Sequence, residues 1–125
     1  MAFLTSIIEK LSRPPEEIRS ENLRHWAETI EDRIPIAEVE SRRKGRVAGV
    51  VQNLRIDPRP GRNSIEATII DGTGELVVKW LGRQELRGVR LGVGLIVDGT
   101  FGADPSGELV ILNPEYVLVT GPEHG

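Results

Sequence analysis

The stretch SIEATIIDGTGELVVKWLG, residues 64–82, decides the fold of this 125-residue chain. Apolar and polar side chains alternate along residues 64–70 and again along 75–81, which is the period of a half-buried β-strand. Between them, Asp71-Gly72-Thr73-Gly74 is a strong signal for a tight hairpin turn. The sequence therefore predicts two antiparallel strands joined by this turn, with Trp80 on the apolar face of the second strand.

Three further strands are predicted around this hairpin. One runs from Val47 to Leu54, and a loop rich in proline, glycine and asparagine follows it at residues 57–63. Another runs from Leu95 to Phe101. The last covers residues 109–119 and is broken at Asn113-Pro114, because proline cannot donate a hydrogen bond to a neighbouring strand.

The connection between the third and fourth strands distinguishes among small β-folds. Gln84 to Arg87 has room for one helical turn. Five strands with a helical connector at this point follow the order of a five-stranded Greek-key OB barrel. A five-stranded β-sandwich and an SH3-like barrel are alternatives, but neither explains the connector. We therefore expect a mainly β fold, an OB-fold domain over residues 35–120.

An N-terminal helical segment is predicted for residues 1–34, and a flexible tail for residues 121–125. Apolar residues between Phe3 and Leu11 have the spacing of one helix face. Pro14-Pro15 interrupts this pattern, and a looser apolar stripe continues to Ile30. Three alternatives stay open for this segment: packing on the barrel, binding a protein partner, or remaining mobile.

The composition narrows the classes of function. The net charge is −3, but residues 41–100 carry 11 basic and 6 acidic side chains, and the acidic excess lies at the two ends. Such asymmetry is a hint of a polyanionic partner. Cysteine is absent, which excludes disulfides and cysteine-bound metals and fits a reducing cytoplasm. The sequence has no apolar run near the roughly 20 residues that span a bilayer, so we expect no membrane partner.

The run from Glu66 to Gly82 resembles the second and third strands of bacterial OB-fold nucleic-acid-binding domains. It is similar in particular to the wedge domain of the branched-DNA helicase, and to small stand-alone OB proteins with the same Asp-Gly-Thr-Gly turn. Residues 113–116, Asn-Pro-Glu-Tyr, resemble the last strand of that family. The resemblance covers residues 42–120. It implies a binding domain without a motor, since the phosphate-binding loop Gly-x-x-x-x-Gly-Lys-Ser/Thr is absent from the sequence.

In an OB barrel, the exposed face of the second and third strands and the adjoining loops form the binding groove. Basic side chains there follow a phosphate backbone, and aromatic rings stack on bases. Trp80 shares the apolar face of its strand, so we expect it in the core. The predicted nucleic-acid-binding residues are Arg46, Arg55, Arg59, Arg62, Lys79, Arg83, Arg87, Phe101 and Tyr116.

The predicted function is non-catalytic binding of single-stranded or junction DNA, or of RNA, without a metal or cofactor. Neither His25 nor His124 has a candidate nucleophile beside it in the sequence, so we expect no enzyme. The alternative is a protein-assembly module, in which the N-terminal helices bind the partner and the barrel is a scaffold. A third class, a small-molecule or sugar-binding barrel, needs polar and aromatic residues that are scarce here.

Overall fold

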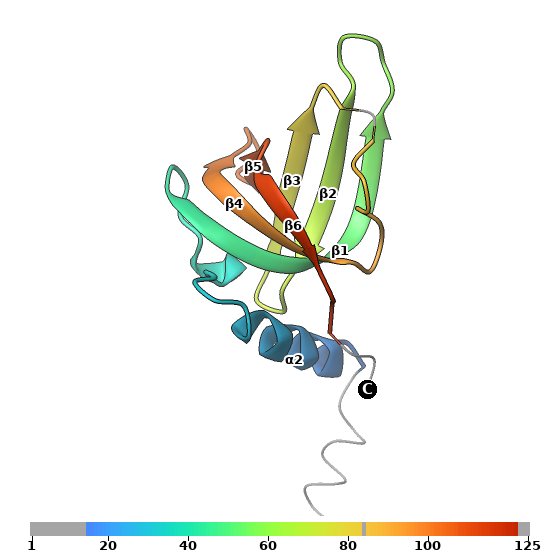
Figure 1. Cartoon of the computed structure of the whole chain (residues 1–125). Coiled ribbons are helices and arrows are strands. Elements are labelled where there is room, and N and C mark those ends of the chain that lie inside the picture. Colours follow the sequence, from blue (N-terminus) through green and yellow to red (C-terminus); the bar gives the residue numbers. More distant parts are fainter. Residues whose placement is uncertain (1–14, 84, 123–125) are drawn as a thin grey trace, which may run out of the picture.

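The computed structural model describes residues 15–83 and 85–122. Helix α2 and a short 3-10 helix, η1, precede six strands in this part of the chain (Figure 1). The elements are α2 (Pro15–Glu28), η1 (Ile36–Glu38), β1 (Lys44–Asp57), β2 (Ser64–Ile70), β3 (Glu75–Leu81), β4 (Gly94–Ala103), β5 (Leu109–Leu112) and β6 (Glu115–Val119). Within the described residues, no helix combines the length and apolar character needed to cross a membrane.

The strands form one sheet that closes on itself. β1 pairs antiparallel with β4 along its first half and with β2 along its second half, and β2 pairs with β3. β3 runs parallel to β5, and β5 pairs with β4, so that β1, β2, β3, β5 and β4 form a ring. The predicted barrel is therefore confirmed, and a single closed sheet excludes the two-sheet sandwich.

The predicted fifth strand is two strands, β5 and β6, so the sheet has six strands rather than five. Asn113 takes a left-handed conformation, with φ of 49°, and Pro114 has no amide to donate. The Asn113 amide donates instead to the carbonyl of Lys79 at 2.7 Å, and its side-chain oxygen accepts from the Leu81 amide at 2.9 Å. These two hydrogen bonds attach the segment between β5 and β6 to the end of β3.

The two strands of the β2–β3 hairpin have the predicted bounds, and every second side chain along them points into the core. Trp80 is 3% exposed, as predicted, and its indole donates to the carbonyl of Pro114 at 3.2 Å. The core consists of Ile36, Val47, Val51, Ile65, Ala67, Ile69, Leu76, Val78, Trp80, Leu86, Leu95, Val97, Phe101 and Ile111. Side chains of the other phase of β2 and β3 are consequently left on the outer face of the barrel.

Asp71 organises the hairpin turn from a fully buried position. Its Oδ1 accepts from the amide and the hydroxyl of Thr73, at 2.8 and 2.6 Å, and from the amide of Gly74 at 3.2 Å. Its Oδ2 accepts from the amide of Ile36 at 2.9 Å. The predicted role of Asp71 in the turn is confirmed, and the same carboxylate also holds η1 against the barrel.

Helix α2 lies across one end of the barrel, next to the β2–β3 turn (Figure 1). It begins at Pro15. Proline is tolerated in the first turn of a helix, because backbone amides there have no hydrogen-bond acceptor within the helix. Trp26 donates to the carbonyl of Thr120 at 2.8 Å, and Ala27 is fully buried. The sequence leaves three alternatives open for the N-terminal segment, and α2 adopts the first of them, packing on the barrel. The helix face predicted between Phe3 and Leu11 lies outside the described residues.

The predicted helical turn at Gln84–Arg87 is wrong: residues 82–83 and 85–93 contain no helix. Gly82, Gly88 and Gly92 have φ values of 74°, 80° and 86°, which a right-handed helix does not use. The chain therefore turns repeatedly. Leu86, 7% exposed, packs into the core from this connector.

Candidate functional site

The outer face of β2 and β3 carries a row of polar side chains. Because the alternate phase fills the core, Glu66 and Lys79 point outward, and they lie directly opposite each other in the strand register. Arg55 on β1 is opposite Glu66 on the other side. Lys79 in turn lies beside Leu112 of β5, which is 55% exposed. The face thus presents Arg55, Glu66, Lys79 and Leu112 in one row across four strands.

A hollow of about 320 Å³ lies on this face. Two carboxylates, Glu66 and Asp104, and the ammonium of Lys79 line it. Val110 and Leu112 add apolar surface, and β4 from residue 100 to 103 completes the wall. The hollow therefore offers hydrogen-bond acceptors and apolar contact, with a cation at its edge.

Asp104 shapes the loop between β4 and β5 at one side of the hollow. Its Oδ1 accepts from the hydroxyl and the amide of Ser106 and from the amide of Glu108, the two amides at 2.9 Å. These bonds, that of the Ser106 hydroxyl foremost, hold the pKa of Asp104 below its usual value. An ionised carboxylate therefore stands at this rim.

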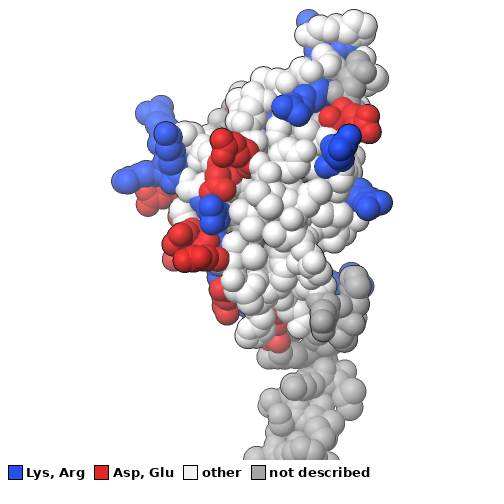
Figure 2. All heavy atoms as spheres, viewed as in Figure 1, with Lys and Arg blue, Asp and Glu red and all other residues white. Residues whose placement is uncertain are grey.

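Four cations on this face or at its end have no carboxylate within 4.0 Å in the described residues. They are Arg55, Arg62, Lys79 and Arg83. The amide of Gly82 donates to the carbonyl of Asn63 at 2.8 Å, which joins the β1–β2 loop to the residues after β3. Figure 2 shows basic side chains toward the end of the barrel where this loop lies.

Two other predicted binding residues form ion pairs with carboxylates of the protein itself. Arg59 donates three side-chain hydrogen bonds to Asp57, the shortest 2.6 Å between Nη2 and Oδ2, and these lower the pKa of Asp57 to about 2. Arg46 donates from Nε to Oδ1 of Asp98 at 2.9 Å and also to the carbonyl of Glu31. Arg46 and Asp98 lie where β1 pairs with β4. Arg46 is therefore on a different side of the barrel from the row formed by Arg55, Glu66, Lys79 and Leu112.

The predicted stacking rings are mostly enclosed. Phe101 lines the hollow but is only 2% exposed, because β4 continues to Ala103 and places Phe101 on an inward phase. Tyr116 is half-buried, and its ring meets that of Trp80 edge-on, with 5.4 Å between the ring centroids. These three residues therefore offer little accessible ring surface on the outer face of β2 and β3.

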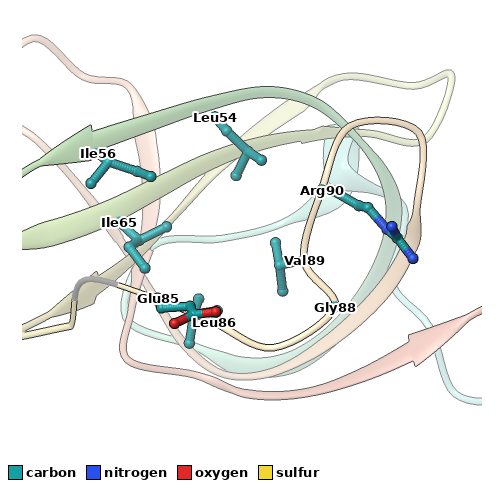
Figure 3. Close-up of a pocket in the computed structure, with 8 residues that line it drawn as sticks. All are labelled: Leu54, Ile56, Ile65, Glu85, Leu86, Gly88, Val89 and Arg90. Carbon is teal, nitrogen blue, oxygen red and sulfur yellow. The ribbon is translucent and has the colours of Figure 1, made fainter.

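A second hollow, of about 380 Å³, lies between the β1–β2 hairpin and the connector (Figure 3). Its lining is Leu54, Ile56, Ile65, Glu85, Leu86, Gly88, Val89 and Arg90. Leu54 and Ile65 have the inward phase, so this hollow lies on the opposite side of the hairpin from Arg55. Arg87 belongs to the same connector, and the structure does not bring it to the row on the outer face.

The sequence prediction missed two residues of this face, Glu66 and Leu112. Strand phase was a signal for Glu66 and Leu112, since both alternate with buried residues. Their meeting with Lys79 depends on pairing between strands, which a single sequence does not display.

Groups of three or more metal-binding side chains are not found within the described residues. His25 has an 80% exposed side chain on α2, with Nδ1 3.8 Å from a carboxylate oxygen of Glu28, so it is a helix-surface residue. His124 lies outside the described part of the chain.

Comparison with solved structures finds similar folds in several proteins. RecG bound to a three-way DNA junction matches with a TM-score of 0.58 and 22% identity, over 76% of this chain and 13% of that one. The OB domain of a Methanosarcina mazei protein matches with a TM-score of 0.58 and 15% identity, over 75% and 90%. The fold is an OB barrel. A replication protein A heterotrimer bound to single-stranded DNA matches this barrel with a TM-score of 0.50 and 18% identity, over 72% and 67%.

The predicted resemblance to an OB domain of the branched-DNA helicase is thus confirmed at the level of fold. This chain spans 13% of the length of RecG, so the likeness concerns one part of that protein. No protein-family model and no curated protein matches the sequence. In the OB barrel, the face that carries the row from Arg55 to Leu112 is the one commonly used for binding.

Proposed function

We propose that this protein is a non-catalytic module that binds single-stranded nucleic acid on the outer face of β2, β3 and β5. The observation that carries the proposal is a set of four cations on this face or at its end that have no carboxylate within 4.0 Å in the described residues, namely Arg55, Arg62, Lys79 and Arg83. Cations without an internal carboxylate are available to phosphates, and each such contact releases counterions from the strand. RecG at a three-way junction and replication protein A on single-stranded DNA provide precedents on the same fold.

The distribution of charge favours a strand that runs along the rim of the hollow. Glu66 and Asp104 repel a phosphate from the hollow itself, whereas the surrounding cations attract it. Bases of a single strand are free to turn toward the protein, while those of a duplex are stacked and paired. Since Phe101 and Trp80 are buried, stacking contributes little, and we expect modest affinity that depends strongly on salt.

Fluorescence anisotropy with labelled single strands and duplexes, in a salt series from about 50 to 200 mM, tests this proposal. We expect the logarithm of the affinity for single strands to fall linearly with that of salt. Arg55→Gln should reduce this slope by about 0.7, the contribution of one phosphate contact. Arg19→Gln, which removes the same charge from an exposed position of α2, is the matched control. Binding without salt dependence, or equal slopes for the two variants, would contradict the proposal.

A second candidate function, protein assembly, is favoured by the surface around β6. Leu91, Val117 and Leu118 are 63%, 58% and 40% exposed, and Figure 2 shows a surface without charged side chains over β6. Exposed apolar surface of this kind marks interaction sites. Under this candidate, Val117→Glu lowers the particle mass measured by light scattering. Deletion of residues 1–14 tests the N-terminal route to a partner separately. A monomer at all concentrations and no mass change in either variant would exclude self-assembly.

A further inference from the structure

Glu66 occupies a position where a negative charge weakens binding to phosphate. It lines the hollow and lies in register between Arg55 and Lys79. Neither cation forms an ion pair with it within 4.0 Å in the described structure. A half-buried carboxylate with no internal partner accepts hydrogen bonds from whatever donor enters the hollow.

We propose that Glu66 reads the base that enters this hollow and selects guanine in a single strand, an inference that rests on the proposed function. The Watson–Crick edge of guanine presents N1–H and the N2 amino group side by side. The two oxygens of a carboxylate accept from both of these donors at once. Adenine, cytosine and thymine each present one donor group on that edge, so they leave one carboxylate oxygen without a partner.

Lys79 completes the pattern that guanine requires. Side chains directly opposite on antiparallel strands have Cβ atoms about 5 Å apart, so the ammonium of Lys79 and the carboxylate of Glu66 reach the same ligand. Guanine O6 lies next to N1–H, and lysine is a common partner of that oxygen. The Glu66 carboxylate therefore accepts from N1–H and the N2 amino group, and the Lys79 ammonium beside it donates to O6 on the same edge of guanine.

The rest of the hollow suits a base better than a phosphate. Val110 and Leu112 supply an apolar surface for the face of a heterocyclic ring. The carboxylate of Asp104 at the opposite rim disfavours a second anion. The Watson–Crick edge is accessible in a single strand and occupied in a duplex, so the same arrangement also favours single strands.

Three labelled strands test this inference by anisotropy at one salt concentration. The first contains thymine alone, the second has one central guanine, and the third has hypoxanthine there, which lacks the N2 amino group. We expect the guanine strand to bind about tenfold more tightly than the thymine strand, with hypoxanthine losing most of that gain. In Glu66→Gln the ratio should approach one, while affinity for the thymine strand does not fall, because the variant removes a negative charge.

Glu75→Gln is the matched control, since Glu75 is an exposed carboxylate at the other end of β3, and its variant should keep the wild-type ratio. Measurable and equal affinity of the wild type for all three strands overturns guanine selection and leaves strand binding intact. Retention of the guanine preference in Glu66→Gln overturns the role of Glu66. Failure of all three strands to bind overturns the proposed function itself, so the two failures are distinguishable.

Discussion

The guanidinium of Arg59 is held by the carboxylate of Asp57, with 2.6 Å between Nη2 and Oδ2. The backbone amide of Arg59 donates to the same carboxylate at 3.1 Å, so the loop after β1 folds around this pair. Arg62, three residues later, has no such partner in the described structure. Two arginines of one loop therefore differ in their availability to a ligand.

Asp57→Asn should strengthen binding of single strands, because it removes a negative charge from the loop and frees the guanidinium of Arg59. The salt slope should become steeper by about 0.7, as expected for one added phosphate contact. Anisotropy in a salt series measures this change. Glu38→Gln makes the same charge change in η1 and should leave the slope unaltered. A slope in Asp57→Asn equal to that of the wild type would show that Arg59 does not contact the strand even when released.

The Asp57–Arg59 pair also predicts a pH dependence of stability. The pKa of Asp57 is lowered from 3.8 to about 2, chiefly by hydrogen bonds from the Arg59 side chain. A lowered carboxyl pKa stabilises the folded state above the pKa of the unfolded chain, and this contribution is lost as pH falls toward the folded value. The difference in melting temperature between the wild type and Arg59→Gln should therefore be complete at about pH 5 and absent below about pH 2. Carboxyl NMR should give a midpoint near 2 for Asp57 in the wild type and a higher one in the variant, and equal midpoints would refute the assignment.

Alanine substitutions at Gly72 and Gly107 distinguish the cost of backbone strain from the cost of disturbing the packing of α2. Their φ values are 86° and 89°, so alanine at either position costs about 1–2 kcal/mol for the left-handed conformation. At Gly72 the added Cβ would also collide with the carbonyl of Ser20 on α2, whereas at Gly107 it meets nothing within 4 Å. Gly72→Ala should therefore destabilise the protein by about 1 kcal/mol or more beyond Gly107→Ala in urea unfolding. Equal effects would mean that α2 moves away from the turn at no cost.

The hairpin around Asp71 was predictable because its determinants are local. Alternation places β2 and β3, and the turn residues join them, so the strand bounds follow from 18 consecutive residues, 64–81. The break at Asn113-Pro114 is likewise a property of two adjacent residues. What depends on distant partners was not predictable. Arg46 pairs with Asp98, 52 residues away, and only the β1–β4 register brings them together.

Phe101 and the connector show two further limits of local patterns. The strand β4 continues two residues beyond Phe101, so a residue predicted at the end of its strand lies in the core. The sequence around Gln84 permits a helical turn, but the glycines on both sides adopt left-handed conformations that a right-handed helix does not use. The candidate site was predicted as an arginine-rich face, and the structure divides those arginines into paired and unpaired ones.

Asp71 should be among the most sensitive positions of the fold, because one buried carboxylate joins segments 35 residues apart. In Asp71→Asn the amide either faces the Ile36 amide or faces Thr73 and Gly74, so donors oppose each other in both orientations. We expect a loss of about 2 kcal/mol, and a larger loss for Asp71→Ala, which removes every acceptor. Thr73→Val is the control: it keeps the carboxylate and removes one hydroxyl, which donates to Asp71 and accepts from the Ala37 amide, at a cost of about 1 kcal/mol.

Urea unfolding measures these differences, and hydrogen exchange at the amide of Ile36 locates them. That amide should exchange faster in Asp71→Ala than in Thr73→Val when both are compared at equal global stability, because only the first variant removes its acceptor. If exchange at Ile36 were as slow in Asp71→Ala as in the wild type, the bond between η1 and the hairpin would not contribute to holding the N-terminal segment on the barrel.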